Sequence, residues 1–199
     1  MFTGRPMTKT FPLRFLLAPV VIALLCVVIH LQPQWHNYLT LSENSLLAQP
    51  WRIFTTHLVH LNIQHLAMNL VALLLLAIIF RQQVQGRLLV NVMVISALFA
   101  TIVPIAVSQE YLFVGLSGVL HGVVVFAGVT MTKQGNKIGF IVLAAVVVKL
   151  IFDMTLNSGY QDWLGAEVAY LCHLGGAIGG ALAVPGLRRR PIDLVKKQS

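Results

Sequence analysis

Charged residues are scarce in this chain of 199 residues. Asp, Glu, Lys and Arg together make up 10% of it, whereas soluble domains contain about 25%. Hydrophobic residues make up 57%. A chain of this length has too little interior to hide so much apolar surface from water. The composition therefore excludes an ordinary water-soluble domain and indicates that lipid is the solvent for most of the chain.

Cysteine and strand-like patterns are also nearly absent. The two cysteines, Cys26 and Cys172, lie far apart inside apolar runs and form no Cys-x-x-Cys pair, so we expect free, buried thiols without a disulfide framework. No ten-residue unit alternates polar with apolar residues, which argues against an outer-membrane β-barrel. Because backbone in lipid must satisfy its own hydrogen bonds, the sequence predicts an all-α membrane protein.

Six long apolar runs are present, at about 14–31, 57–80, 88–107, 115–132, 138–153 and 166–187. A helix needs about 20 apolar residues to cross the hydrocarbon layer, so we predict six transmembrane helices joined by short linkers. The second run begins polar and the fifth is short. The first run follows a basic start without a small-x-small cleavage site, and we interpret it as an uncleaved helix. No second domain is visible, which predicts one transmembrane domain over residues 1–199.

The placement of charge predicts the orientation of the helices. With a cytoplasmic N-terminus, 12 of the 14 basic residues fall on the inner side, the exceptions being Arg52 and Lys149. Five of the six acids then fall outside, namely Glu43, Glu110, Asp153, Asp162 and Glu167. This positive-inside pattern predicts a cytoplasmic N-terminus (1–14) and a basic cytoplasmic tail (188–199). It also accounts for the net charge of +8 without nucleic acid as a partner.

The longest outer loop, residues 32–56, contains three residues typical of membrane interfaces. They are Trp35, Tyr38 and Trp51, and several leucines accompany them. Tryptophan and tyrosine favour the boundary between lipid and water, so we expect this loop to lie partly in the outer leaflet. A membrane-embedded first outer loop is therefore part of the predicted fold.

Ser117 is the candidate nucleophile, because polar residues within apolar runs are costly and mark functional sites. It opens the fourth run in Gly115-Leu116-Ser117-Gly118, whose glycines allow close backbone approach, and free N–H groups at a helix start can face an oxyanion. The same motif could serve helix packing alone. A serine also needs a base. His173 can supply one if Gly176 and Gly180 pack its helix against another; otherwise it is a buried structural histidine.

A third polar set opens the second run. His65 and Asn69 stand four residues apart, so they share a helix face from which both can donate hydrogen bonds to a developing oxyanion. For His57 and Asn62 we favour a polar helix entrance at the membrane interface. His60 could be a structural hydrogen-bonding residue that shapes the outer loop.

These motifs together resemble the rhomboid intramembrane serine proteases over nearly the whole chain. They are Trp51-Arg52, His60 with His65-x-x-x-Asn69, Gly115-x-Ser117-Gly118, and His173-x-x-Gly176-x-x-x-Gly180, in the family's order on the second, fourth and sixth helices. The resemblance implies a six-helix rhomboid-like bundle with residues 32–51 as its membrane-embedded first loop. Ser117 would be the nucleophile and His173 the base of a dyad. The Ser117 backbone, His65 and Asn69 would form the oxyanion hole, with no metal or cofactor.

The segment Gly115-Leu116-Ser117-Gly118-Val119-Leu120-His121-Gly122 resembles the rhombosortase branch, since many rhomboids have tyrosine where this chain has His121. That branch implies a membrane-anchored substrate with a C-terminal Gly-Gly-type sorting tail. It also implies a bacterial inner membrane with the active site on the periplasmic face. His121 shares a helix face with Ser117 and could itself be the base. The resemblance assigns that role to His173 and leaves His121 to pack against it. Cys172, where many relatives have glycine or alanine, is small enough to leave the dyad intact.

Other functions fit the sequence less well. An inactive relative that binds membrane clients would have lost the serine or the histidine, and this chain keeps both. A transporter would show paired helices broken near their middles. A metal site at His57, His60 and His65 lacks carboxylates and a His-Glu-x-x-His motif. An aspartyl protease needs two acids within the membrane, whereas we expect Asp153 and Asp162 at or beyond the outer end of the fifth helix.

The expected reaction is hydrolysis of a peptide bond near the outer end of a substrate's transmembrane helix. Ser117 would attack the carbonyl carbon, His173 would take the proton, and water would release the acyl-enzyme. No carboxylate is expected beside His173, so packing or another polar group would set the tautomer of the imidazole.

Overall fold

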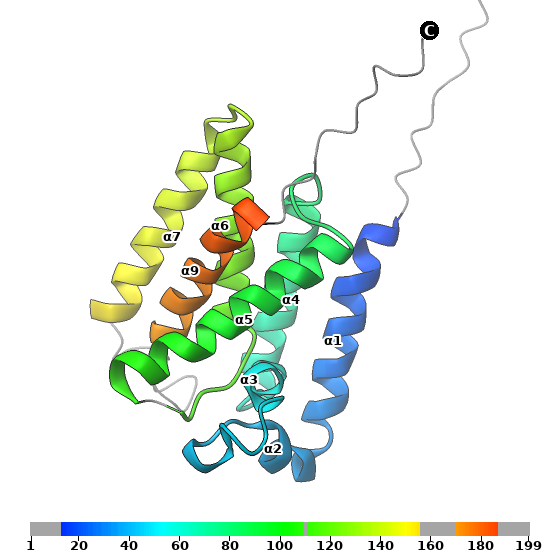
Figure 1. Cartoon of the computed structure of the whole chain (residues 1–199). Helices are drawn as coiled ribbons and strands as arrows, with labels where there is room; N and C mark the ends of the chain where they lie inside the picture. Colours follow the sequence, from blue (N-terminus) through cyan, green and yellow to red (C-terminus); the bar gives the residue numbers. More distant parts are fainter. Residues whose placement is uncertain (1–12, 110, 156–169, 187–199) are drawn as a thin grey trace, which may run out of the picture.

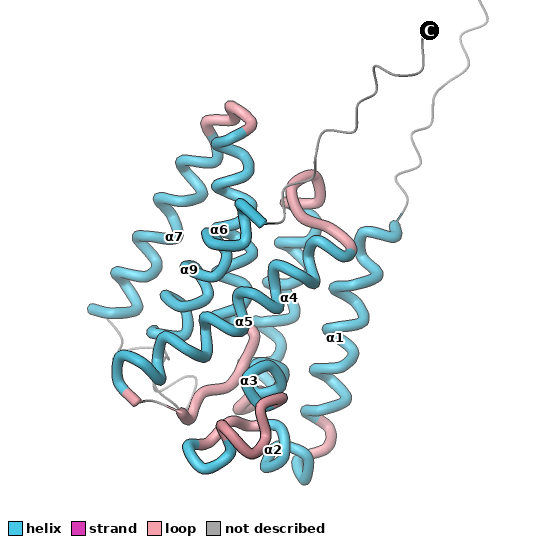
Figure 2. Tube along the Cα trace, in the orientation of Figure 1, coloured by secondary structure: helices cyan, strands magenta, loops and turns pink. Residues whose placement is uncertain are grey.

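A computed structural model of the chain describes residues 13–109, 111–155 and 170–186. Within these residues the fold is all helical and contains no strand (Figure 2), in agreement with the predicted fold class. The predictions for Glu110, Asp162, Glu167 and the two charged termini lie outside the described residues.

Each of the six apolar runs coincides with a helix. These helices are α1 (Leu17–His30, preceded by the 3-10 turn η1, Leu13–Leu16), α4 (Ile63–Ile79), α5 (Arg87–Ser108), α6 (Ser117–Lys133), α7 (Ile138–Thr155) and α9 (Tyr170–Gly186). Among the described residues, three segments are long and apolar enough to cross a membrane: Leu13–His30, α5 and α7. A bent helix pair that ends with α4 can count as a fourth, while α6 and α9 are apolar but shorter. The number of six spans stays a prediction.

The second apolar run begins as a continuous helix later than we predicted. The pair formed by Arg52–Leu58 and Ile63–Ile79 is bent by 99° at the residues between them. Asn62 fixes the start of α4, because its side-chain oxygen accepts a hydrogen bond from the backbone N–H of His65 at 2.8 Å. Asn62 is therefore a helix-capping residue, which agrees with its interpretation as a polar helix entrance.

The segment between α1 and α4 is folded into short helices. They are α2 (Pro33–Leu39), η2 (Glu43–Ser45), α3 (Arg52–Thr55) and η3 (Thr56–Leu58), gathered at one end of the bundle (bottom of Figure 1). Arg52 is 8% exposed and donates to the Thr40 carbonyl and to the Gln49 side-chain oxygen, each at 2.6 Å. Because two nitrogens of the guanidinium group donate hydrogen bonds, Arg52 can be buried here. The position of this segment in a lipid leaflet stays a prediction.

α6 is the central helix and packs against α5, α7 and α9. Its closest contact is with α9: a Cβ atom on Gly176 would lie 1.8 Å from the Gly118 carbonyl oxygen, and one on Gly180 would lie 2.0 Å from the Gly122 carbonyl oxygen. Only glycine permits such an approach, so backbone touches backbone along this interface.

The helices at the edge of the bundle are far less buried than α6. Only 17% of the Leu13–His30 span and 17% of the α7 span is buried. Their exposed apolar faces suit lipid as the solvent.

Candidate active site

Ser117 and His173 meet at the interface of α6 and α9. Ser117 is the first residue of α6, and its Oγ lies 2.9 Å from Nε2 of His173. The contact between Gly118 and Gly176 lies one residue after the serine and three residues after the histidine. The glycine packing therefore brings together two side chains that are 56 residues apart in the sequence.

Asp153 lies beside His173, a position that we did not predict from the sequence. It is 4% exposed, and its Oδ2 lies 2.8 Å from Nδ1 of His173. Asp153 lies in the last turn of α7, close to the helix end where we expected it, but our expectation that no carboxylate lies beside His173 is wrong. α7 continues to Thr155, and its buried residues Gly139, Val146 and Asp153 recur every seven positions. This spacing places Asp153 on the one face of α7 that points into the bundle.

Lys149 is the second partner of this carboxylate. Its Nζ contacts Oδ1 of Asp153 from one helical turn away, and its side chain is 48% exposed. The two carboxylate oxygens therefore have different partners, one cationic and one aromatic. Lys149 and Asp153 stand at i and i+4 in an otherwise apolar run, and that spacing was the signal in the sequence that could have revealed the pair.

The contacts of His173 define which nitrogen carries its proton. An ionised carboxylate only accepts hydrogen bonds, so Nδ1 must donate to Asp153. A neutral imidazole has one N–H, so Nε2 is left as the acceptor for the Ser117 hydroxyl. This tautomer is the one that a histidine needs in order to take a proton from serine.

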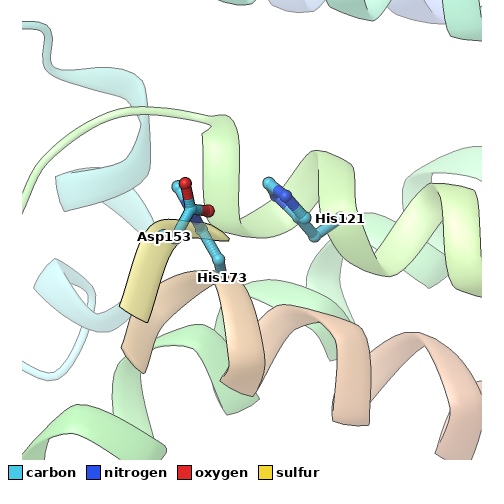
Figure 3. A group of neighbouring side chains, drawn as sticks. All are labelled: His121, Asp153 and His173. Carbon is cyan, nitrogen blue, oxygen red and sulfur yellow. The ribbon is translucent and has the colours of Figure 1, made fainter. Parts of the chain in front are cut away.

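His121 lies flat against His173 (Figure 3). The two ring centroids are 4.3 Å apart and the ring planes differ by 18°. Nδ1 of His121 donates to the Ser117 carbonyl oxygen on its own helix at 2.8 Å. The serine hydroxyl is within hydrogen-bonding distance of His173, whereas the His121 contact is with the backbone of the same serine.

Ligand atoms of His121, Asp153 and His173 lie within 4.8 Å of one another, near enough for a metal ion. However, Nδ1 of His121 and both nitrogens of His173 are engaged in the hydrogen bonds described above. Stacked rings also direct their nitrogen lone pairs along nearly parallel planes instead of toward one point. The geometry suits hydrogen bonding better than metal coordination. Among the described residues, His57, His60 and His65 do not form a group of this kind.

His65 and Asn69 face the loop that leads into α6. Gly115 has φ of 105°, and a Cβ atom there would lie 2.7 Å from Nε2 of His65 and 3.5 Å from Nδ2 of Asn69. One N–H of the Asn69 amide donates to the His65 carbonyl oxygen at 3.1 Å, which leaves the amide a second donor. Both side chains therefore lie beside the backbone two residues before Ser117.

Two residues of η3 hold this loop in place. Thr56 donates from Oγ1 to the Phe113 carbonyl oxygen at 2.6 Å, and its own carbonyl accepts from the Gly115 N–H at 3.4 Å. His57 is 2% exposed, and its Nδ1 lies 3.4 Å from the Gly115 carbonyl oxygen while its Nε2 lies 3.0 Å from the Thr101 hydroxyl on α5. Our interpretation of His57 as an interfacial helix entrance is therefore wrong, because the ring is buried between η3 and α5. The role of Thr56 could not be predicted from the sequence, because a single threonine belongs to no recognisable motif.

His60 supports His65 from the break before α4. It is 1% exposed, and its Nδ1 lies 3.1 Å from the Leu58 carbonyl oxygen. Its ring meets the edge of the His65 ring, with centroids 5.1 Å apart. These contacts agree with a structural hydrogen-bonding role. Both cysteines, Cys26 and Cys172, are buried, as predicted, and they are not joined by a disulfide.

A cavity of about 1000 Å³ opens over these residues. Ser117, Lys149, Asp153 and His173 lie on its surface. Much of the remaining wall is apolar and comes from two helices, with Met68, Ala72 and Leu76 on α4 and Val142, Ala145 and Val146 on α7. A cavity lined in this way suits an apolar segment that has polar backbone to present to the serine.

Comparison with known proteins places the chain in a family. A search of curated proteins found no match. The Rhomboid domain matches residues 47–190, which is well over half of the chain and includes α3 to α9. Ser117, His173 and Asp153 all fall within the match. The chain therefore belongs to the Rhomboid family.

Proposed function

We propose that the protein is an intramembrane serine endopeptidase, a hydrolase that cleaves a membrane-anchored protein near the outer end of its transmembrane segment. Membership of the Rhomboid family supports an integral membrane protein of the intramembrane serine protease class. The observation that carries the proposal is the contact of 2.9 Å between Ser117 Oγ and His173 Nε2 on the wall of a large cavity. Nucleophile and base need this distance for proton transfer.

In this mechanism Ser117 Oγ attacks the substrate carbonyl carbon while Nε2 of His173 takes the hydroxyl proton. The negative oxygen that forms is met by donors around Gly115: the Ser117 N–H, the His65 ring and the Asn69 amide. The first N–H groups of α6 have no partner within the helix, so they are available for this purpose. The imidazolium then gives its proton to the leaving amine, and an acyl-enzyme remains. Water deacylates it by the reverse proton path.

The substrate is a transmembrane helix whose end unwinds into the cavity. Side chains of α4 and α7 form apolar walls that suit a hydrophobic segment. Helical backbone must unwind before a protease can reach its carbonyl groups, because those groups are hydrogen-bonded within the helix. Small residues in the substrate favour such unwinding, since glycine gains the most freedom outside a helix.

We further propose that the substrate carries a C-terminal Gly-Gly-type sorting tail, as in the rhombosortase branch. The motif from Gly115 to Gly122 supports this, and His121 in that motif stacks on His173. The same reading assigns the protein to a bacterial inner membrane with both termini in the cytoplasm. The Ser117 end of α6 would then open to the periplasmic face.

Incubation of the purified protein with a membrane protein that bears a Gly-Gly tail tests the proposal. Wild type should release a product whose intact mass identifies the cut, and Ser117→Ala should release none. Ser108→Ala is the matched control, since Ser108 is exposed and donates to the Pro104 carbonyl oxygen on its own helix. Equal processing by wild type and Ser117→Ala would overturn the proposal. Capture of the tailed protein without cleavage by any variant would favour an inactive, client-binding relative instead.

A further inference from the structure

We propose that Asp153 and Lys149 extend the pair of Ser117 and His173 into a chain of four polar side chains. Asp153 acts as a positioning residue for the base, and Lys149 keeps its carboxylate charged. This inference rests on the proposed protease function. It replaces the expectation of a two-residue dyad with a serine–histidine–aspartate arrangement built from three helices.

The geometry places the carboxylate where the carboxylate of a proteolytic triad acts. Oδ2 of Asp153 lies 2.8 Å from Nδ1 of His173, on the side of the ring opposite to the contact of 2.9 Å between Nε2 and Ser117. Figure 3 shows Asp153 approaching from α7 (yellow) and His173 from α9 (orange). Because Asp153 and His173 are 4% and 6% exposed, water competes little for this hydrogen bond.

The carboxylate fixes the tautomer of the base. A neutral imidazole can carry its proton on either nitrogen, and only the Nδ1–H form can accept a proton at Nε2. With Asp153 as an acceptor, Nδ1 keeps its proton throughout. The serine proton moves to Nε2 during attack and passes to the leaving amine afterwards. Asp153 gains no proton, and its charge stabilises the imidazolium between the two steps.

Lys149 explains how a carboxylate is tolerated at this place. An ionised carboxylate with little access to water is costly unless it is paired. Lys149 contacts the oxygen that His173 does not use, so each oxygen has its own partner. The lysine side chain is 48% exposed, which lets its amino group keep some water while the stem covers apolar surface. Without Lys149 one carboxylate oxygen would lose its partner, and a protonated carboxyl group could donate to Nδ1 instead of accepting from it, which would favour the other tautomer.

His121 supplies the remaining constraint on the base. The hydrogen bond from Nδ1 to Asp153 restricts rotation of the His173 ring in its own plane. His121 lies against the face of the ring, with centroids 4.3 Å apart, and restricts its tilt. Together the two contacts fix both the tilt and the rotation of the imidazole. A base that is already oriented toward Ser117 lowers the entropic part of the reaction barrier. Loss of this orientation should therefore lower kcat.

Kinetics on the full-length protein in proteoliposomes test the inference. Asp153→Asn should lower kcat by about 10²–10⁴-fold with KM changed little, because the same replacement in soluble serine protease triads costs about 10⁴-fold. Asp153→Glu should recover part of the loss. Lys149→Met should cause a smaller loss than Asp153→Asn, and Lys149→Arg should restore activity. Lys137→Met is the control, since it removes an exposed cation next to α7 at its far end. Ser117→Ala reports on the proposed function itself.

Two further readouts separate positioning from simple support of the fold. A fluorophosphonate probe should label Ser117 more slowly in Asp153→Asn but to the same final extent, and the unfolding temperature should stay near that of wild type. If Asp153→Asn matches wild type in kcat while Ser117→Ala is inactive, this inference is wrong and the protease proposal stands. A fall in unfolding temperature together with loss of probe labelling would show a purely structural pair, which also overturns it. If Ser117→Ala cleaves like wild type, the protease proposal fails first.

Discussion

α9 and α7 hold their active-site residues against α6 in different ways. α9 meets α6 through backbone, with Gly176 against Gly118 and Gly180 against Gly122. α7 has one comparable contact, near its beginning, where a Cβ atom on Gly139 would lie 2.6 Å from the Gly128 carbonyl oxygen. At its other end α7 reaches the site through the side chain of Asp153. The distance between serine and histidine is thus set by rigid backbone packing, and the orientation of the histidine by a polar side chain.

The largest effect should come from breaking the contact between α6 and α9. In Gly176→Ala the new methyl group would lie 1.8 Å from a backbone oxygen, which cannot move without shifting the whole helix. A displacement of about 1 Å at a catalytic group costs about 100-fold in rate, and overpacking costs about 1–3 kcal/mol of stability. We expect kcat/KM to fall at least that far and the unfolding temperature to drop. If the variant has the kinetics of wild type, the glycine packing does not determine the distance between Ser117 and His173.

A comparable loss of rate, without disruption of the contact between α6 and α9, is expected at Gly115, before the serine. Alanine there would be strained at φ of 105°, and its methyl group would push into the His65 ring, 2.5 Å from Cε1. Loss of one oxyanion donor lowers kcat by about 10²–10³-fold, so Gly115→Ala should lower kcat in that range with little change in KM. Gly135→Ala is the matched control, because Gly135 has φ of 79° but no atom within 4 Å of the added carbon. It should lose stability and keep its activity; equal kinetic losses in both variants would count against the proposed role of His65.

His121→Phe should have a modest effect on rate. Phenylalanine keeps a flat ring against His173 but cannot donate to the Ser117 carbonyl, so we expect kcat to fall only a few-fold. The companion variant His173→Phe should be inactive, because it removes the base. Steady-state cleavage rates of the two variants decide between the two histidines. Activity that survives the loss of His173 but not of His121 would make His121 the base.

The smallest effect should follow substitution between α6 and the middle of α7. In Gly128→Ala the added carbon meets the end of the Leu143 side chain at 3.0 Å, and a flexible side chain can move aside. We expect a stability change of about 1 kcal/mol, at the low end of the cost of overpacking, and unchanged kcat. Thermal unfolding and kinetics of Gly128→Ala and Gly176→Ala, measured together, would compare how the α6–α7 and α6–α9 interfaces respond to one added methyl group. Equal losses would remove the distinction between them.

Several residues of the site were predictable from the sequence because their cost in lipid marks them out. Ser117, His173, His65 and Asn69 are polar residues in apolar runs, and family motifs order them along the chain. Asn62 was correctly placed at a helix entrance, since asparagine is a common capping residue. His57 was not, because its burial depends on the approach of α5, whose Thr101 lies 44 residues further along the chain.

The sequence by itself determined the class of the protein: apolar runs of membrane length, charges between them, and a serine flanked by glycines. Those features follow from the cost of transferring single residues into lipid, which depends little on the rest of the fold. Only the tertiary structure decided that Asp153 belongs to the site. α7 is apolar on almost every side, so no periodicity reveals which face points inward. That choice is made by the packing of α7 on α6 and α9, where one carboxylate meets both a histidine and a lysine.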